Sequence, residues 1–149
     1  MPDLKELYQE VILDHSKSPR NFHKLADANR KAVGRNPLCG DQFTVYLRVE
    51  DGRIADIAFE GQGCAISKSS ASMMTMAVKG RTAAEAEDLF DRFHALVTGK
   101  KGAAEAPDLG KLAAFQGVSG FPVRVKCASL AWHTLKAALE EKEASISIE

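Results

Sequence analysis

The 149-residue chain has no long apolar run, no excess of charge of either sign and only three cysteines. No segment approaches the roughly 20 consecutive apolar residues of a membrane-spanning helix. The first twenty residues are amphipathic and contain acidic side chains, unlike a signal peptide. Because 20 basic residues balance 20 acidic ones, the chain has no general attraction to nucleic acid or anionic lipid. We therefore expect a cytoplasmic protein that binds neither nucleic acid nor membranes.

The cysteines do not have the number or spacing of a disulfide framework or a known short motif. Three cysteines cannot all pair with one another, and cytoplasmic thiols stay reduced. No Cys-x-x-Cys pair is present, which excludes a zinc finger or a thioredoxin motif. A lone cysteine is often only a small core side chain, but three in turns and at helix ends favour metal binding or thiol chemistry.

Hydrophobic spacing predicts several helices and one clear β-hairpin. The apolar pattern predicts helices over residues 3–15, with Asp3 as the N-terminal cap, over 64–80, over 82–97, and from about Cys127 onward. Alternating strands at 43–50 and 53–60 flank Asp51-Gly52, a favoured hairpin turn, and residues 31–34 are a candidate strand. The high content of glycine and charged residues predicts a loop over 98–110. Residues 111–126 fit neither a helix nor a strand pattern.

This order of elements predicts the fold class. At 45% hydrophobic and 27% charged, the composition is that of a globular protein with its own core, and the length fits one domain over residues 1–149. Strands come early and helices late, without a βαβ alternation. We predict an α+β fold in which a small antiparallel β-sheet of about three strands is covered on one face by helices.

Each cysteine lies where thiol chemistry is favoured. Cys39 follows Asn-Pro-Leu, Cys64 follows Gly-Gln-Gly at an expected helix start, and Cys127 follows Arg124 and Lys126 at another. A thiol at a helix N-terminus or beside cations has a lowered pKa, because dipoles and cations stabilise the thiolate. Asp41 lies two residues beyond Cys39, so one extended segment can present both side chains on the same side.

Together these side chains form a candidate metal-ligand set. Three thiolates and one carboxylate supply the four ligands of a tetrahedral Zn²⁺ site, and iron or an iron-sulfur cluster can use the same donors. The spacing of these residues in the sequence does not determine which metal they bind. The histidines and Met73, Met74 and Met76 lie outside this set, and we interpret them as core or surface residues.

Four segments resemble the IscU/SufU/NifU-N family, and they occur in the family's order over nearly the whole chain. They are Leu38-Cys39-Gly40-Asp41, the stretch from Phe59 to Ser67, Ser70 to Met74, and Arg124-Val125-Lys126-Cys127. Several motifs in the right order are far more specific than a lone Cys-Gly-Asp. Two features are similar to the SufU-type branch: Lys126 stands where scaffold-type members have histidine, and residues 99–120 look like an insertion.

Resemblance to SufU implies an iron-sulfur cluster assembly protein that is a zinc-bound sulfurtransferase. In this reading Cys39 accepts persulfide sulfur from a SufS-type cysteine desulfurase and passes it towards a downstream iron-sulfur assembly complex. The resemblance implies zinc ligation by Cys39, Asp41, Cys64 and Cys127, and a docking or gating role for Arg124. Two alternatives stay open: an IscU-type scaffold on which a [2Fe-2S] cluster is built and transferred, and a metal with a purely structural role.

Overall fold

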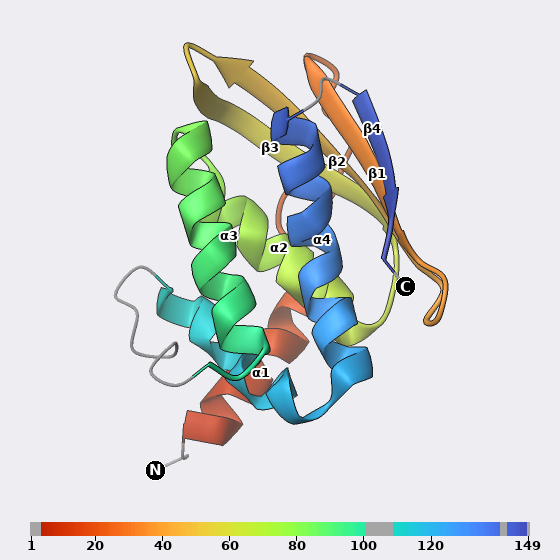
Figure 1. The fold of residues 1–149 in the computed structure, drawn as a ribbon, viewed down its shortest axis with the longest axis vertical. Coiled ribbons are helices and arrows are strands. Elements are labelled where there is room, and N and C mark those ends of the chain that lie inside the picture. The colour runs from red at the N-terminus through yellow and green to blue at the C-terminus, as the bar shows by residue number, and fades with distance from the viewer. Residues whose placement is uncertain (1–3, 101–108, 141–142, 149) are drawn as a thin grey trace.

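The computed structural model describes residues 4–100, 109–140 and 143–148. One helix precedes three consecutive strands, further helices follow them, and a last strand returns to the sheet, so that the sheet lies on one side of the molecule and the helices on the other (Figure 1). The elements are α1 (Leu4–Lys17), β1 (Arg30–Asn36), β2 (Asp41–Glu50), β3 (Arg53–Gln62), α2 (Ala65–Val78), α3 (Ala83–Val97), the 3₁₀ helix η2 (Gly110–Gly120), α4 (Pro122–Glu140) and β4 (Glu143–Ser147). This arrangement confirms the α+β class.

The sheet has four strands in the order β3-β2-β1-β4. Strands β1, β2 and β3 are antiparallel neighbours, as predicted, but β4 pairs parallel with β1 and makes the sheet mixed. The prediction of an antiparallel sheet of about three strands was therefore incomplete. The sequence of β4, Glu-Ala-Ser-Ile-Ser, is short and mostly polar, so its strand conformation depends on the neighbouring strand rather than on a local pattern.

The hairpin and helix α3 follow local signals in the sequence. Asp51 and Gly52 both have positive φ, 52° and 76°, as the favoured two-residue hairpin turn requires. Helix α3 begins at a capping box in which Thr82 and Glu85 each accept a hydrogen bond from the other's backbone amide. The expected strand at 31–34 is confirmed as part of β1.

The remaining predictions differ from the structure in their bounds. Helix α1 extends to Lys17, and the predicted cap Asp3 lies outside the described residues. Residues 101–108 of the predicted loop also lie outside them, and η2 occupies much of the stretch that fitted no pattern. Helix α4 begins at Pro122, where proline suits the first turn, and not near Cys127.

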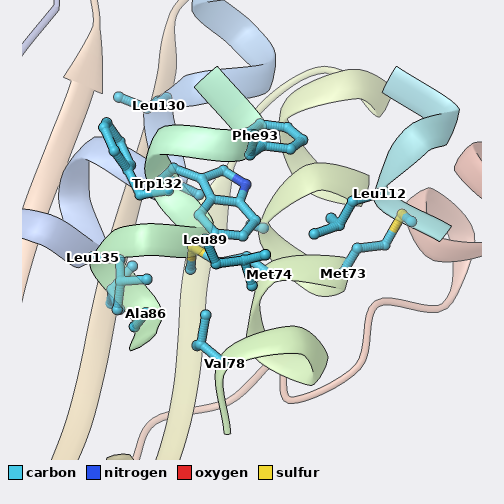
Figure 2. Close-up of a cluster of buried hydrophobic side chains, with 14 of the residues drawn as sticks. Met73, Met74, Val78, Ala86, Leu89, Phe93, Leu112, Leu130, Trp132 and Leu135 are labelled. Carbon is cyan, nitrogen blue, oxygen red and sulfur yellow. The ribbon is translucent and has the colours of Figure 1, made fainter. Parts of the chain in front are cut away.

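The core lies between the sheet and the helices. Helix α4 approaches β1 closely because Gly34 has no side chain: a Cβ there would lie 1.9 Å from Thr134 Oγ1. Trp132 of α4 is fully buried and stacks on Phe93 of α3, with ring centroids 4.7 Å apart (Figure 2). Within the described ranges no helix combines the length and the apolar composition needed to cross a bilayer.

Candidate metal centre

Cys39 and Asp41 lie at the turn that joins β1 to β2. Asn36 and Asp41 are the last cross-strand pair before the turn, and Cys39 N donates to Asn36 O over 3.2 Å. Gly40 has φ of +69°, a conformation that glycine adopts without strain. The turn leaves Cys39 exposed, whereas Asp41 at the start of β2 is only 2% exposed.

Cys64 is the N-cap of α2, which confirms the prediction that it lies at the start of this helix. Its sulfur accepts a hydrogen bond from Ser67 N over 3.4 Å, and Ser67 Oγ donates to Cys64 O over 3.0 Å. Its own backbone amide donates to Asp41 Oδ1 over 3.1 Å. Cys64 therefore connects the first turn of α2 to the carboxylate of the β1–β2 turn.

Cys127 comes from α4 and completes the group. It is buried, and its sulfur lies 3.6 Å from the sulfur of Cys39. The ligand atoms of Cys39, Asp41 and Cys127 all lie within 4.8 Å of one another. Cys64 lies outside that tight group but is close enough to influence the ionisation of Cys127. The fold thus brings all four predicted ligand residues to one end of the sheet.

The ionisation of Cys127 differs from the expectation. Because the residue lies in the second turn of α4, it does not receive the stabilisation that a helix N-terminus gives to a thiolate. Burial raises the pKa of the Cys127 thiol, and the hydrogen bond with Cys39 and the nearby Cys64 and Asp41 raise it further. Without a cation, Cys127 is therefore a neutral thiol near pH 7.

The carboxylate of Asp41 provides a test of whether the site suits a cation. Oδ1 accepts the Cys64 amide, but Oδ2 is buried and has no hydrogen-bond partner among the described residues. An unpaired buried carboxylate oxygen is costly unless a cation or donor meets it. Oxygen and thiolate donors at such short separations fit Zn²⁺, and they also fit iron.

Gly63, which the sequence analysis did not single out as a site residue, shapes the site. A Cβ on Gly63 would lie 2.3 Å from Ser67 Oγ and 2.9 Å from Asp41 Oδ1. Only glycine at this position lets the β3–α2 connection pass so close to the carboxylate. The Gly-Gln-Gly motif was visible in the sequence, but the contact that requires Gly63 depends on two segments distant along the chain.

Arg124 lies near this centre without contacting its sulfur atoms in any described hydrogen bond. It is exposed on the first turn of α4, and its guanidinium carbon lies 4.5 Å from the centroid of the Phe121 ring. Both residues line a surface cleft of about 980 Å³, together with apolar side chains that include Ile12, Leu13 and Ile66. Arg124 therefore faces a cleft beside the centre rather than the ligand atoms.

Comparison with known proteins agrees with this geometry. The sequence profile of the NifU-like N terminal domain matches residues 7–128. The chain is 40% identical over 141 residues to the zinc-dependent sulfurtransferase SufU of Bacillus subtilis, covering 95% of each protein. It is 42% identical over 137 residues to the iron-sulfur cluster assembly scaffold protein IscU of Streptococcus pyogenes, covering 92% of this chain and 85% of that protein.

A solved structure is similar over the same length. It is that of an iron-sulfur cluster assembly scaffold protein for the SUF system from Fervidobacterium islandicum. The TM-score is 0.82 at 35% identity, and the match covers 92% of this chain and 99% of the other. The fold and the sequence therefore point to the same group of proteins.

Proposed function

Because the chain belongs to the NifU-like N-terminal domain family, the IscU/SufU family of iron-sulfur cluster assembly proteins, we propose that it is a zinc-dependent sulfurtransferase. Its sulfur donor is a SufS-type cysteine desulfurase, and its product is sulfur delivered to a downstream iron-sulfur assembly complex. The whole chain, residues 1–149, acts as one domain with an insertion at 99–120. The placement of the exposed Cys39 thiol beside buried ligands carries the proposal.

Cys39 is the sulfur acceptor because its thiol is exposed and caps no helix. Cys64 is also exposed, but its sulfur accepts the amide of Ser67 as the cap of α2, and Cys127 is buried. Cys39 lies at an exposed turn next to Leu38, which is 67% exposed. A protruding turn can enter the active site of a partner enzyme, whereas a helix cap and a core helix cannot.

The transfer step needs no external oxidant or reductant. The Cys39 thiolate attacks the terminal sulfur of a cysteine persulfide on the desulfurase. A sulfur–sulfur bond forms at Cys39 while the sulfur–sulfur bond of the donor breaks, and the donor cysteine leaves as a thiolate. Cys39 then carries the persulfide.

Cys39, Asp41, Cys64 and Cys127 are the proposed zinc ligands. Bound zinc keeps thiolates deprotonated at neutral pH and stores them in an unreactive form. Because burial raises the pKa of Cys127, metal loading must release a proton from this thiol. Asp41, Cys39 and Cys64, which all lie close to Cys127, supply the remaining negative charge around the cation.

Arg124 is the proposed docking residue for the desulfurase. It lines the cleft formed by residues of α1, α2, η2 and α4, and its guanidinium lies over the half-exposed ring of Phe121. A cation on an apolar rim suits a partner surface that offers a carboxylate beside apolar side chains. Arg124 thus contributes to recognition, while Cys39 performs the chemistry.

The test of this function is sulfur uptake by Cys39 variants. With a cysteine desulfurase and cysteine, the Cys39→Ala variant should take up no sulfur, because it lacks the attacking thiolate, while the unchanged protein becomes persulfidated. Mass spectrometry of the intact protein measures the added sulfur. Met76→Ala is the control, since Met76 is an exposed sulfur-containing residue on the distant part of α2 and should not matter. Undiminished uptake by Cys39→Ala would refute the assignment.

A [2Fe-2S] scaffold is the second candidate, because relatives of similar identity carry that name and use the same kinds of ligands. Elemental analysis of the protein purified without added metal separates the two functions. One zinc per chain and a marked rise in desulfurase turnover support the sulfurtransferase. Iron with acid-labile sulfide and little effect on turnover support the scaffold.

A further inference from the structure

Asn36, the last residue of β1, is fully buried, yet both polar atoms of its side chain lack a hydrogen-bond partner among the described residues. Most buried side-chain amides in folded proteins are hydrogen-bonded, because an unpaired amide loses its hydration without compensation. Asn36 is therefore an exception that needs a reason. Its position beside the candidate metal centre suggests one.

Asn36 and Asp41 are directly opposed across β1 and β2. Residues opposed in this way project to the same face of a sheet, with Cβ atoms about 4.5–5.5 Å apart. That face is the one covered by helices, because Gly34, two residues earlier on β1, lies against Thr134 and Leu130 of α4. The side chains of Asn36 and Asp41 are thus neighbours in the buried layer between the sheet and α4.

The unpaired atoms of the two residues are complementary. Asp41 Oδ2 is a buried acceptor without a donor, and Asn36 Nδ2 is a buried donor without an acceptor. Asn36 is also neutral, so it can donate to a carboxylate without changing the charge of the centre. An aspartate at the same position would place a second negative charge there, and an apolar residue would offer no donor.

We propose that Asn36 is a positioning residue of the metal centre, whose Nδ2–H donates to the Asp41 carboxylate when the metal is bound. This inference rests on the proposed metal binding. With Oδ1 held by the Cys64 amide, a donor at Oδ2 fixes the rotation of the carboxylate and so the direction of its metal-binding lone pair. Asn36 then acts on the metal only through Asp41.

The test compares zinc affinity with the stability of the metal-free protein. Asn36→Leu keeps the branching and the number of side-chain heavy atoms but has no donor, so zinc affinity should fall about 10- to 100-fold, as for lost partners of metal ligands. The thermal midpoint of the metal-free protein should stay the same or rise, because an unpaired polar group has been removed. Asn36→Ala serves as a second variant if Leu prevents folding. Competition with a chromophoric chelator measures the affinity.

The matched control is Thr134→Val, which removes a fully buried polar group from the same layer; among the described residues, the Thr134 hydroxyl hydrogen-bonds to Leu130 O of its own helix. Its zinc affinity should equal that of the unchanged protein. Replacing zinc with Co²⁺ adds a spectroscopic measurement, since a misplaced carboxylate shifts the visible ligand-field bands. A packing role for Asn36 would leave those bands unchanged.

A double-mutant cycle with Asp41→Ala decides whether Asn36 acts through Asp41. In the Asp41→Ala background, Asn36→Leu should cause no further loss of zinc affinity. Equal affinity of Asn36→Leu and the unchanged protein would overturn this inference while leaving zinc binding intact. Failure of the unchanged protein to bind zinc would instead overturn the proposed function. An additive loss in the cycle would show that Asn36 does not act through Asp41.

Discussion

At the scale of single residues, the candidate centre depends on a glycine that carries no chemistry. Gly63 lies where β3 ends and α2 begins, and it faces Ser67, Asp41 and Phe43 at distances that leave no room for a methyl group. Its backbone is not in the left-handed region, so space rather than conformational freedom requires glycine here. A residue without a side chain thus determines where the Asp41 carboxylate lies.

Gly63→Ala should therefore weaken metal binding as well as destabilise the metal-free fold. The added methyl group would lie 2.9 Å from both Asp41 Oδ1 and Phe43 Cζ, so the carboxylate or the strand must move. We expect zinc affinity to fall about 10- to 100-fold and the free energy of unfolding of the metal-free protein to fall by about 1–3 kcal/mol. Chelator competition and denaturant unfolding measure the two effects.

Gly117→Ala is the control for this substitution, because a Cβ at Gly117 would meet nothing within 4 Å. It should change neither zinc affinity nor stability beyond a few tenths of a kcal/mol. If Gly63→Ala bound zinc as tightly as the unchanged protein, the close approach of this glycine to Asp41 would have no role in metal binding.

At the scale of elements, the interface between α3 and α4 contains a cluster of rings with two histidines. His133 of α4 packs edge-on against Phe90 of α3, with centroids 5.1 Å apart, and His94 lies 6.0 Å from His133. Lys136 lies over the Phe90 ring. Burial lowers the pKa of His133, and the positive charges of His94 and Lys136 lower it further.

The lowered pKa of His133 predicts that acid weakens this interface. Above pH of about 6.5, the ordinary histidine pKa, His133 is neutral in both the folded and unfolded states and contributes nothing. Below that pH the unfolded state takes up the proton first, so stability falls until the pH reaches the pKa of the folded state. His133→Phe should lose less stability than the unchanged protein between pH 7 and about 5.

Denaturant unfolding at several pH values measures this difference. His23→Gln is the control, because His23 is exposed in the segment between α1 and β1 and should leave the pH dependence unchanged. Burial also lowers the pKa of His15, which adds a loss of the same sign, so His133→Phe should remove only part of the acid sensitivity. Identical pH profiles for His133→Phe and the unchanged protein would contradict the prediction.

Some helices, strands and turns of this fold could be predicted from the sequence, and others could not. The Asp51-Gly52 turn and the helix over 82–97, which begins at the Thr82–Glu85 capping box, depend on residues close together in the chain, and both were predicted correctly. Strand β4 and the start of α4 depend on distant partners: β4 needs the exposed edge of β1, and residues 122–126 are helical although their apolar pattern is weak. Local patterns cannot reveal such dependence.

The candidate site also has some features that could be predicted from the sequence and others that could not. The four candidate ligand residues were predicted from turns, helix starts and family resemblance, and the structure groups Cys39, Asp41 and Cys127 with Cys64 close by. The sequence did not reveal that Cys127 lies in the second turn of α4 rather than at its start, or that Gly63 and Asn36 contact or adjoin Asp41. Those features arise from the packing of α4 and α2 on the sheet, which no short motif encodes.

At the scale of the whole molecule, the core and the candidate metal centre occupy different places. Phe93 of α3 is among the largest fully buried side chains and packs against Trp132 of α4 and Phe115 of η2, and the Trp132 indole donates to Ser70 of α2. Figure 2 shows Phe93 and Trp132 within this cluster of buried side chains. The candidate ligand residues lie elsewhere, where the β1–β2 turn meets α2 and α4. The core is thus large enough to hold the fold without a metal.

Removal of the metal should therefore leave a folded protein of lower stability. After chelation we expect the helical circular dichroism to be retained and the thermal transition to remain cooperative, because the apolar core stays buried. Adding free zinc at 100 times its dissociation constant should stabilise the protein by about 2.7 kcal/mol and raise the thermal midpoint by about 5–10 °C. Loss of helical signal on chelation would instead show that the metal supplies the folding energy, as in small zinc domains. A folded metal-free protein that no longer accepts sulfur would separate the two roles, because the core would then account for the fold and the metal centre for the chemistry.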